Sequence, residues 1–264
     1  MLKTGPRIEA RFKELAAAGK KAFIPYIMSG DPSLSASLRL VKTLEDAGAD
    51  IIELGVPFSD PVADGPVIEA AAERARKAGV NLRKVLGLVA EIRKHSEIPI
   101  VLMTYFNPVL KFGEDKFAKR AVEAGADGVI VPDLPVEEAD LLKKYAAQRG
   151  LDTIFLAAPT SGPERLKLVS GASTGFIYYV SLTGITGAKL SHYEEIEKSV
   201  KRLKKISGGK PVAVGFGVSN PEEAGRVAKT ADGVIVGSAV VKRAREDSPS
   251  AFSKWLKNMR EAIG

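Results

Sequence analysis

The sequence contains no cysteine, and this absence removes several kinds of chemistry at once. Without thiols there are no disulfides, no cysteine nucleophile and no cysteine metal ligands, and the chain suits a reducing compartment. Histidine is nearly as scarce: His95 and His192 fall at the ends of expected helices, where we interpret them as surface residues. No apolar run approaches the ~20 residues of a membrane-spanning helix, and residues 1–13 lack the apolar stretch of a secretory signal. We therefore expect a cytoplasmic protein without a metal site.

The composition that remains is that of an ordinary globular protein. Hydrophobic residues make up 45% and charged residues 27%, which excludes disordered and fibrous classes. The length of 264 residues suits one α/β barrel of about 250 residues or two smaller domains. The formal net charge is +7, but the densest basic run, residues 198–205, lies on one face of an expected helix without interleaved aromatic side chains. We interpret this run as a solvated face rather than a nucleic-acid groove.

Short apolar strands alternate with amphipathic helices along the chain. After an opening helix at residues 7–18, strand cores begin near residues 22, 50, 98, 127, 152, 175, 211 and 232. Three of them share the phrase Ala-Asp followed by a buried strand, and no linker interrupts the series. Eight such units predict a single domain over residues 1–264, folded as a (β/α)8 TIM barrel with an extra N-terminal helix. A doubly wound open sheet is the alternative, although it usually has fewer strands.

The connection after the second expected strand, residues 53–66, is unusually long and stiff. It contains three prolines and two glycines, so it continues neither as a strand nor as a regular helix before Pro66. A plain connection needs only about 2–6 residues, and a solvated surface turn is the alternative to a catalytic loop. Glu53 and Asp64 place two carboxylates on this loop, and such a pair can move protons if burial raises the pKa of one of them.

Two glycine-bearing strand ends predict a phosphate site. The seventh expected strand ends in Gly215-Phe216-Gly217 and the eighth in Gly237-Ser238. Glycine lets backbone N–H groups approach an anion, a helix that begins after Ser238 adds the positive end of its dipole, and barrels often bind phosphate at these two loops. Glycines that serve only tight turns are the alternative.

A second long connection, residues 181–189, is rich in glycine and threonine. Its composition predicts a mobile lid facing the stiff acidic loop, with an ordinary surface loop as the alternative. The chain has no Gly-x-Ser-x-Gly elbow and no lysine inside an apolar strand. Cofactor-independent proton transfer or carbon–carbon cleavage on a phosphorylated substrate is therefore the chemistry that the residues favour.

Several stretches resemble the tryptophan synthase alpha subunit family. The match is most specific at residues 53–66, and it continues at residues 23–32, 103–108, 132–135, 183–187 and 214–217, so that it spans essentially the whole chain. The resemblance implies a lyase that cleaves indole-3-glycerol phosphate to indole and glyceraldehyde 3-phosphate in L-tryptophan biosynthesis. It also implies that this chain needs no cofactor of its own.

The resemblance assigns roles to individual residues. Glu53 resembles the acid–base glutamate that protonates the indole C3 and relays the proton of the glycerol hydroxyl. Asp64 resembles the aspartate that accepts a hydrogen bond from the indole N–H, and Tyr178 the tyrosine near the catalytic glutamate. Thr186 and Gly187 resemble the lid that closes by contact with Asp64.

The same resemblance implies a phosphate cradle and apolar walls for the indole. The cradle comprises Gly187, Gly217, Gly237 and Ser238, and the walls comprise Tyr26, Ile68, Met103, Tyr105, Ile130, Thr186, Phe216 and Ile235. For the apolar members, packing in the barrel core is an equal alternative. Two positions depart from the family pattern: Tyr26, where phenylalanine is frequent, and Leu182, where the lid can be polar. Neither departure removes a catalytic group.

A partner also follows from the resemblance. Such chains dock on a pyridoxal-phosphate beta subunit in an alpha-beta-beta-alpha heterotetramer and pass indole through a tunnel, with Pro57, Asp60 and the lid near the contact. The pyridoxal phosphate belongs to the beta subunit. Three alternatives remain open: a stand-alone indole-releasing lyase, a non-catalytic allosteric subunit that retains the phosphate site, and another phosphate-binding barrel such as an isomerase or epimerase of aromatic biosynthesis.

Overall fold

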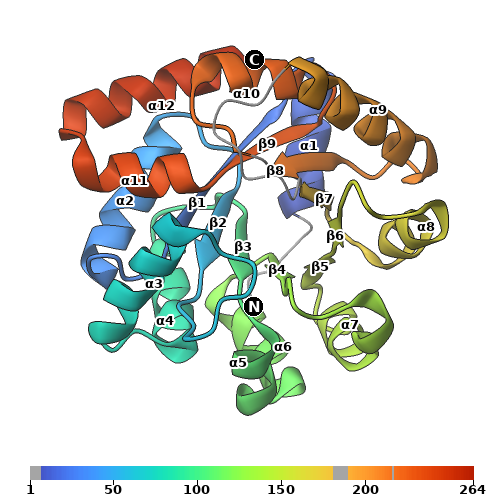
Figure 1. Cartoon of the computed structure of the whole chain (residues 1–264). Helices are drawn as coiled ribbons and strands as arrows, with labels where there is room; N and C mark the ends of the chain where they lie inside the picture. Colours follow the sequence, from blue (N-terminus) through green and yellow to red (C-terminus); the bar gives the residue numbers. More distant parts are fainter. Residues whose placement is uncertain (1–6, 181–189, 216) are drawn as a thin grey trace.

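The strands form one parallel sheet that curls into a barrel with the helices outside it (Figure 1). The computed structural model describes residues 7–180, 190–215 and 217–264, and it describes the backbone alone for residues 190–192. The expected lid and Phe216 therefore lie outside the described residues. The sheet order is β5-β4-β3-β2-β1-β9-β8-β7-β6. The strands are β1 (Ala22–Met28), β2 (Ile52–Gly55), β3 (Ile100–Met103), β4 (Gly128–Ile130), β5 (Asp152–Ile154), β6 (Leu156–Ala157), β7 (Ile177–Val180), β8 (Val212–Gly215) and β9 (Gly233–Val236).

The ring closes through the fifth expected strand. Only Phe155 separates β5, which pairs with β4, from β6, which pairs with β7, so the two segments run on as one strand. The described segments thus make the eight-stranded TIM barrel that the sequence predicted, and the doubly wound sheet is excluded. The aspartates taken as strand starts at positions 50, 127 and 232 lie just before their strands, because the first ladder pairs form one or two residues later.

Helices follow most of the strands at the positions that the periodicity predicted. Ser33 caps α2 by accepting the Ala36 backbone N–H. The apolar residues Val136, Ala139, Leu142 and Ala146 stand at helical spacing and predict one helix, but the structure has a short 3-10 turn followed by a separate α-helix, with a break at Ala139. The helices are α1 (Arg7–Ala17), α2 (Leu34–Asp46), α3 (Pro66–Lys77), α4 (Leu82–Ile92), α5 (Phe106–Phe112), α6 (Glu114–Ala124), η1 (Val136–Glu138), α7 (Asp140–Ala147), α8 (Pro163–Ala172), α9 (Leu190–Ile206), α10 (Pro221–Ala228), α11 (Ser238–Glu246) and α12 (Pro249–Ile263).

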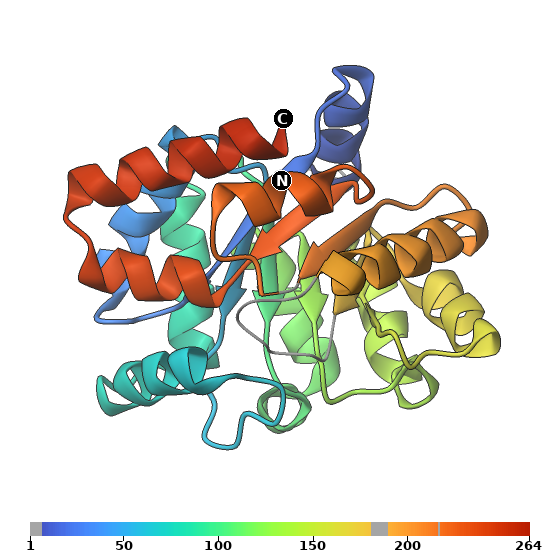
Figure 2. The same ribbon diagram turned by 45° about the horizontal axis from the view of Figure 1, so that its top comes forward.

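Helix α1 covers the amino-terminal mouth of the barrel. Its buried side chains Ile8, Phe12 and Leu15 belong to the same apolar cluster as the inward-facing residues of the strands. The Phe12 ring lies 5.7 Å from that of Phe176, centroid to centroid. Figure 2 shows α1 at one end of the barrel and the connection around residue 60 at the other. Helix α1 thus covers the amino-terminal end of the barrel and does not cover the carboxyl end, where the sequence places the candidate active site.

A repeated hydrogen bond ties the strands together at the amino-terminal end. When β5 and β6 are counted as one strand, a side chain one to three residues before each of β2, β4, β7 and β9 accepts a backbone N–H at the start of the preceding strand. The four bonds run from Phe23 to Asp50 (2.7 Å), from Ile100 to Asp127 (2.8 Å), from Thr153 to Thr174 (2.8 Å) and from Val212 to Asp232 (3.0 Å). The aspartates of the three Ala-Asp repeats in the sequence are the acceptors in three of these four hydrogen bonds.

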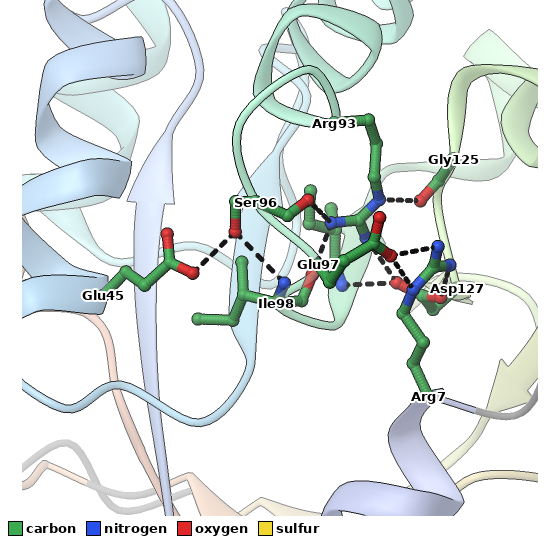
Figure 3. Close-up of polar contacts among 9 residues, drawn as sticks. Arg7, Glu45, Arg93, Ser96, Glu97, Ile98, Gly125 and Asp127 are labelled. Carbon is green, nitrogen blue, oxygen red and sulfur yellow. Dashed lines mark hydrogen bonds and ion pairs between the residues drawn. The ribbon is translucent and has the colours of Figure 1, made fainter.

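Arginines from distant segments complete two of these aspartate sites. Arg7 of α1 donates to one carboxylate oxygen of Asp127 at 2.9 Å, and Arg93 donates to the other at 2.6 Å (Figure 3). Asp50 is held in the same way by Arg11 and by Arg260 of the last helix. Both carboxylates are almost fully buried, so these pairs fasten α1 and α12 onto the barrel. None of the described helices is long and apolar enough to span a bilayer.

Candidate active site

Glu53 is a buried carboxylate inside the barrel. It lies in β2 opposite Tyr26 of β1 and Val101 of β3, and Val101 belongs to the interior cluster. Its strand was expected to end at Ile52 but continues to Gly55, so Glu53 stands within the strand rather than after it. The residue is 1% exposed, and neither carboxylate oxygen has a hydrogen-bond partner among the described residues. Burial, and secondarily the charge of Asp64, raise the pKa of Glu53 to about 8.

Asp64 reaches the same place from the stiff loop. The hydroxyl of Tyr105 accepts the backbone N–H of Ala63 at 3.2 Å, and the ring of Phe58 stacks on that of Tyr105 with the centroids 5.3 Å apart. These contacts hold the loop over the end of β3. Burial raises the pKa of Asp64 to about 6, against the effect of the nearby Tyr105 hydroxyl, which favours the ionised form.

The two carboxylates therefore differ in protonation near pH 7. Glu53, with a pKa of about 8, is mostly protonated, whereas Asp64, with a pKa of about 6, is mostly ionised. Paired carboxyl groups whose environments separate their pKa values are the usual basis of an acid and a charge-stabilising base in one site. The structure thus brings together the pair that the sequence singled out.

Two tyrosines stand beside this pair, each over a glycine. A Cβ atom at position 55 would lie 2.1 Å from the Tyr26 hydroxyl, and one at position 215 would lie 2.3 Å from the Tyr178 hydroxyl, so both positions require glycine. Burial and the charges of both carboxylates raise the pKa of Tyr26 and of Tyr178 well above the ordinary value. Both phenols consequently remain protonated and can donate hydrogen bonds.

The expected phosphate end adjoins β1. Gly237 precedes α11, whose first residue is Ser238, and a Cβ atom at position 237 would lie 3.7 Å from the Ile68 Cδ1 atom and 3.8 Å from the Tyr26 Cβ atom. The N-terminus of α11 can therefore face an anion beside the tyrosine. Gly217 is exposed and has a φ of 25°. Gly187 lies outside the described residues.

The expected apolar walls occupy different depths. Ile130 and Ile235 are 0% and 3% exposed and pack in the interior cluster with the side chains of α1. Met103 is half-buried at the end of β3 and packs against both apolar clusters of the protein. Ile68 comes from α3 beside Gly237. Thr186 and Phe216 lie outside the described residues.

Some contributions escaped the sequence-based reasoning. It named Tyr105 as a wall for the indole and did not foresee that its hydroxyl tethers the acidic loop; it gave Phe58 no role. It also did not single out Gly55 or foresee why position 215 needs glycine. A glycine inside an apolar strand often marks a close approach by another group, and that signal was available at both positions.

Known proteins resemble this chain over nearly its whole length. A sequence model of the family described as "Tryptophan synthase alpha chain" matches residues 12–262. The protein of that description from Geotalea uraniireducens is 50% identical over 236 residues, which cover 89% of this chain and 88% of the relative. The one from Prochlorococcus marinus is 44% identical and covers 99% of this chain and 96% of the relative.

Solved structures show the same likeness. The tryptophan synthase subunit alpha of Legionella pneumophila superposes with a TM-score of 0.90 at 42% identity, covering 97% of this chain and 98% of its own. A structure of the tryptophan synthase of Mycobacterium tuberculosis, in an open form with BRD0059 bound, contains a chain that superposes with a TM-score of 0.89 at 37% identity and the same coverage. Fold and sequence thus agree on one group of relatives.

Proposed function

The chain belongs to the tryptophan synthase alpha chain family, and on this premise we propose that Glu53, Asp64 and Tyr178 carry the family's reaction. That reaction cleaves indole-3-glycerol phosphate to indole and glyceraldehyde 3-phosphate in tryptophan biosynthesis. The observation that carries the proposal is the pairing of a buried, protonated Glu53 with an ionised Asp64 at the carboxyl end of the barrel.

Glu53 acts first as the acid. Its proton goes to C3 of the indole, and the electron pair of the C2–C3 double bond forms the new C–H bond. Positive charge then develops at the ring nitrogen, where Asp64 accepts the N–H hydrogen bond and stabilises the charge. Ionised Asp64 suits this role because it needs no proton transfer of its own.

Glu53 acts next as the base. Its carboxylate takes the proton of the hydroxyl on the carbon attached to C3, the C–O bond becomes a carbonyl, and the carbon–carbon bond breaks. The electron pair of that bond restores the indole ring, and Glu53 is protonated again for the next turnover. The phenol of Tyr178 lies over Gly215 near the carboxylate and supplies a fixed donor.

The phosphate and the indole occupy the groups around this pair. In the proposal the phosphate binds at Gly217, Gly237 and Ser238, where backbone N–H groups and the N-terminus of α11 favour an anion. Gly187 and Thr186 of the lid and Phe216 are included on the strength of the resemblance. Tyr26, Tyr105, Ile68 and Met103 surround the indole, and Ile130 and Ile235 form the floor beneath it.

A beta subunit is the partner of this family. We propose an alpha-beta-beta-alpha heterotetramer in which the beta subunit holds pyridoxal phosphate and docks at the carboxyl end of the barrel. Val62, 80% exposed in the acidic loop, and Leu110, 56% exposed on α5, support docking at this end. Pro57 and Asp60 belong to the same loop. A cytoplasmic location and a single domain over residues 1–264 are part of the proposal.

The deciding experiment measures indole release from indole-3-glycerol phosphate by the purified chain, alone and with a beta subunit. We expect release by both preparations and a higher rate in the complex. Glu53→Gln should abolish release while leaving the fold intact by circular dichroism. Full activity of that variant would overturn the role proposed for Glu53, no release by either wild-type preparation would favour the non-catalytic alternative, and an unchanged rate with beta subunit would favour the stand-alone lyase.

A further inference from the structure

Tyr26 lies between the two halves of the proposed site. Its strand, β1, pairs with β2 on one side and with β9 on the other. The ladder with β2 sets Tyr26 opposite Glu53, and the Cβ atom of Tyr26 is 3.8 Å from the place of a Cβ at position 237. A substrate that reaches from the α11 N-terminus to Glu53 must therefore pass Tyr26.

The Tyr26 hydroxyl leans toward β2. It occupies the space over Gly55, where a Cβ would be only 2.1 Å away, and Gly55 is the next residue of β2 after Glu53 whose Cα faces the same side. The residue is 3% exposed. Neither carboxylate oxygen of Glu53 has a hydrogen-bond partner among the described residues. A phenol donor and a buried, unpaired acceptor thus stand on one face of neighbouring strands, and leaving the acceptor without a partner costs free energy.

We propose that Tyr26 is a positioning residue for Glu53, whose ionised carboxylate accepts a hydrogen bond from the Tyr26 hydroxyl. The inference rests on the proposed function, because Glu53 is ionised in the interval between giving its proton to C3 and receiving the hydroxyl proton. A hydrogen bond to a charged group is about twice as strong as one between neutral groups, so the tyrosine stabilises this state more than the protonated one.

The other ionisable groups around Glu53 do not replace this donor. Asp64 is an anion at neutral pH and disfavours a second negative charge, which raises the pKa of Glu53. Tyr105 is engaged with the loop through Ala63 and lies against Asp64. Tyr178 stands over Gly215, on β8, and approaches Glu53 from the far side of the ring of strands. The two phenols therefore flank the carboxylate, and each contributes its own donor.

The test removes only the phenol oxygen, with Tyr26→Phe in the chain complexed with a beta subunit. The alkaline limb of kcat/KM, where Glu53 loses its proton, should move upward by about half to one pH unit, because the ionised form loses a donor. We expect kcat to fall about tenfold and KM to change less than about twofold. Tyr179→Phe is the matched control: it deletes the same oxygen from a tyrosine of β7 that is 2% exposed and belongs to the apolar cluster other than the interior one. Its pH profile should equal that of the wild type.

Two further measurements test the hydrogen bond directly. 3-Fluorotyrosine at position 26 retains the hydroxyl and makes it a stronger donor, so the alkaline limb of kcat/KM should move to lower pH instead. In the free protein, a carbon-13 titration should show the Glu53 carboxyl losing its proton at a higher pH in Tyr26→Phe, with the signal assigned by its absence in Glu53→Gln. Unchanged limbs and an unchanged titration would overturn the inference. An active Glu53→Gln would overturn the role proposed for Glu53 itself, so the two failures are distinguishable.

Discussion

The hydroxyl of Tyr178 lies where a side chain at position 215 would begin, since a Cβ on Gly215 would be 2.3 Å from it. These residues are 37 positions apart but face the same side of β7 and β8, and the ladder pairs Tyr178 with Ala213. The absence of a side chain at Gly215 thus leaves space over the end of β8 for the Tyr178 ring of the neighbouring strand β7.

Gly215→Ala should therefore displace Tyr178. We expect a loss of about 1–3 kcal/mol in the free energy of unfolding, as for other overpacked sites, and at least about a tenfold loss of kcat/KM. The same substitution in a Tyr178→Leu background should cost less stability, because the displaced ring is gone. Urea denaturation of the four proteins in this double-mutant cycle measures the coupling. Additive losses would show that the two residues do not compete for the space.

The pH dependence of activity should be bell-shaped. Activity requires Asp64 ionised, with a pKa of about 6, and Glu53 protonated, with a pKa of about 8. The rate should fall below pH 6 and above pH 8 and be highest between them. The substrate phosphate also titrates at about pH 6. Asp64→Asn distinguishes the titration of Asp64 from that of the substrate phosphate. The residual activity of this variant should fall at acidic pH only as far as protonation of the phosphate lowers it.

Glu53→Gln should make the protein more stable at neutral and alkaline pH. The pKa of Glu53 is raised from 4.5 to about 8 in the folded state, so below pH 4.5 both folded and unfolded chains hold the proton. Between pH 4.5 and 8 the unfolded chain releases it more readily, and wild-type stability falls by up to about 1.4 kcal/mol per pH unit through this group. Denaturation of both proteins at pH 5 and pH 8 tests this: the advantage of glutamine should grow to a few kcal/mol at the higher pH. An advantage independent of pH would contradict the raised pKa.

Asp127→Ala should destabilise the barrel without affecting the chemistry. The carboxylate is 4% exposed and accepts hydrogen bonds from Arg7, Arg93 and the Ile100 N–H, so its loss leaves buried donors unpaired. We expect a cost of about 3–5 kcal/mol. Glu91→Ala, which removes an exposed pair with Lys94, should cost less than about 0.5 kcal/mol. Thermal unfolding measures both, and kcat of the folded proteins should equal that of the wild type because this end of the barrel is opposite Glu53.

Local patterns predicted the architecture well and the element boundaries less well. The alternation of apolar runs and amphipathic segments gave eight strands and the opening helix, because burial on both faces of a parallel sheet leaves a continuous apolar signature. The end of β2 at Gly55 was missed because it depends on pairing with Met103 in another strand. The break at Ala139 between η1 and α7 also lies inside a run of good helical spacing.

The candidate site was predicted in part for a similar reason. A stiff acidic loop and glycine-rich strand ends are local features of the sequence, so Glu53, Asp64 and the glycines near 217 and 237 could be singled out as candidates. The contact of Tyr26 with Gly55 joins residues 29 positions apart, and that of Tyr105 with Ala63 joins residues 42 apart. A glycine inside a strand can signal that another group comes close, but no local pattern identifies which distant residue makes the contact.

By itself, the sequence determined the class of barrel, the family and the two carboxylates, since periodicity, turn residues and motifs are properties of neighbouring positions. The tertiary structure alone decided how those groups behave. Burial of Glu53 beside Asp64 separates their pKa values, the two glycines admit the two phenols, and arginines from α1 and α12 fasten the opposite end. These effects arise from solvent exclusion and from distances between segments remote in the chain, so they exist only once the barrel has closed.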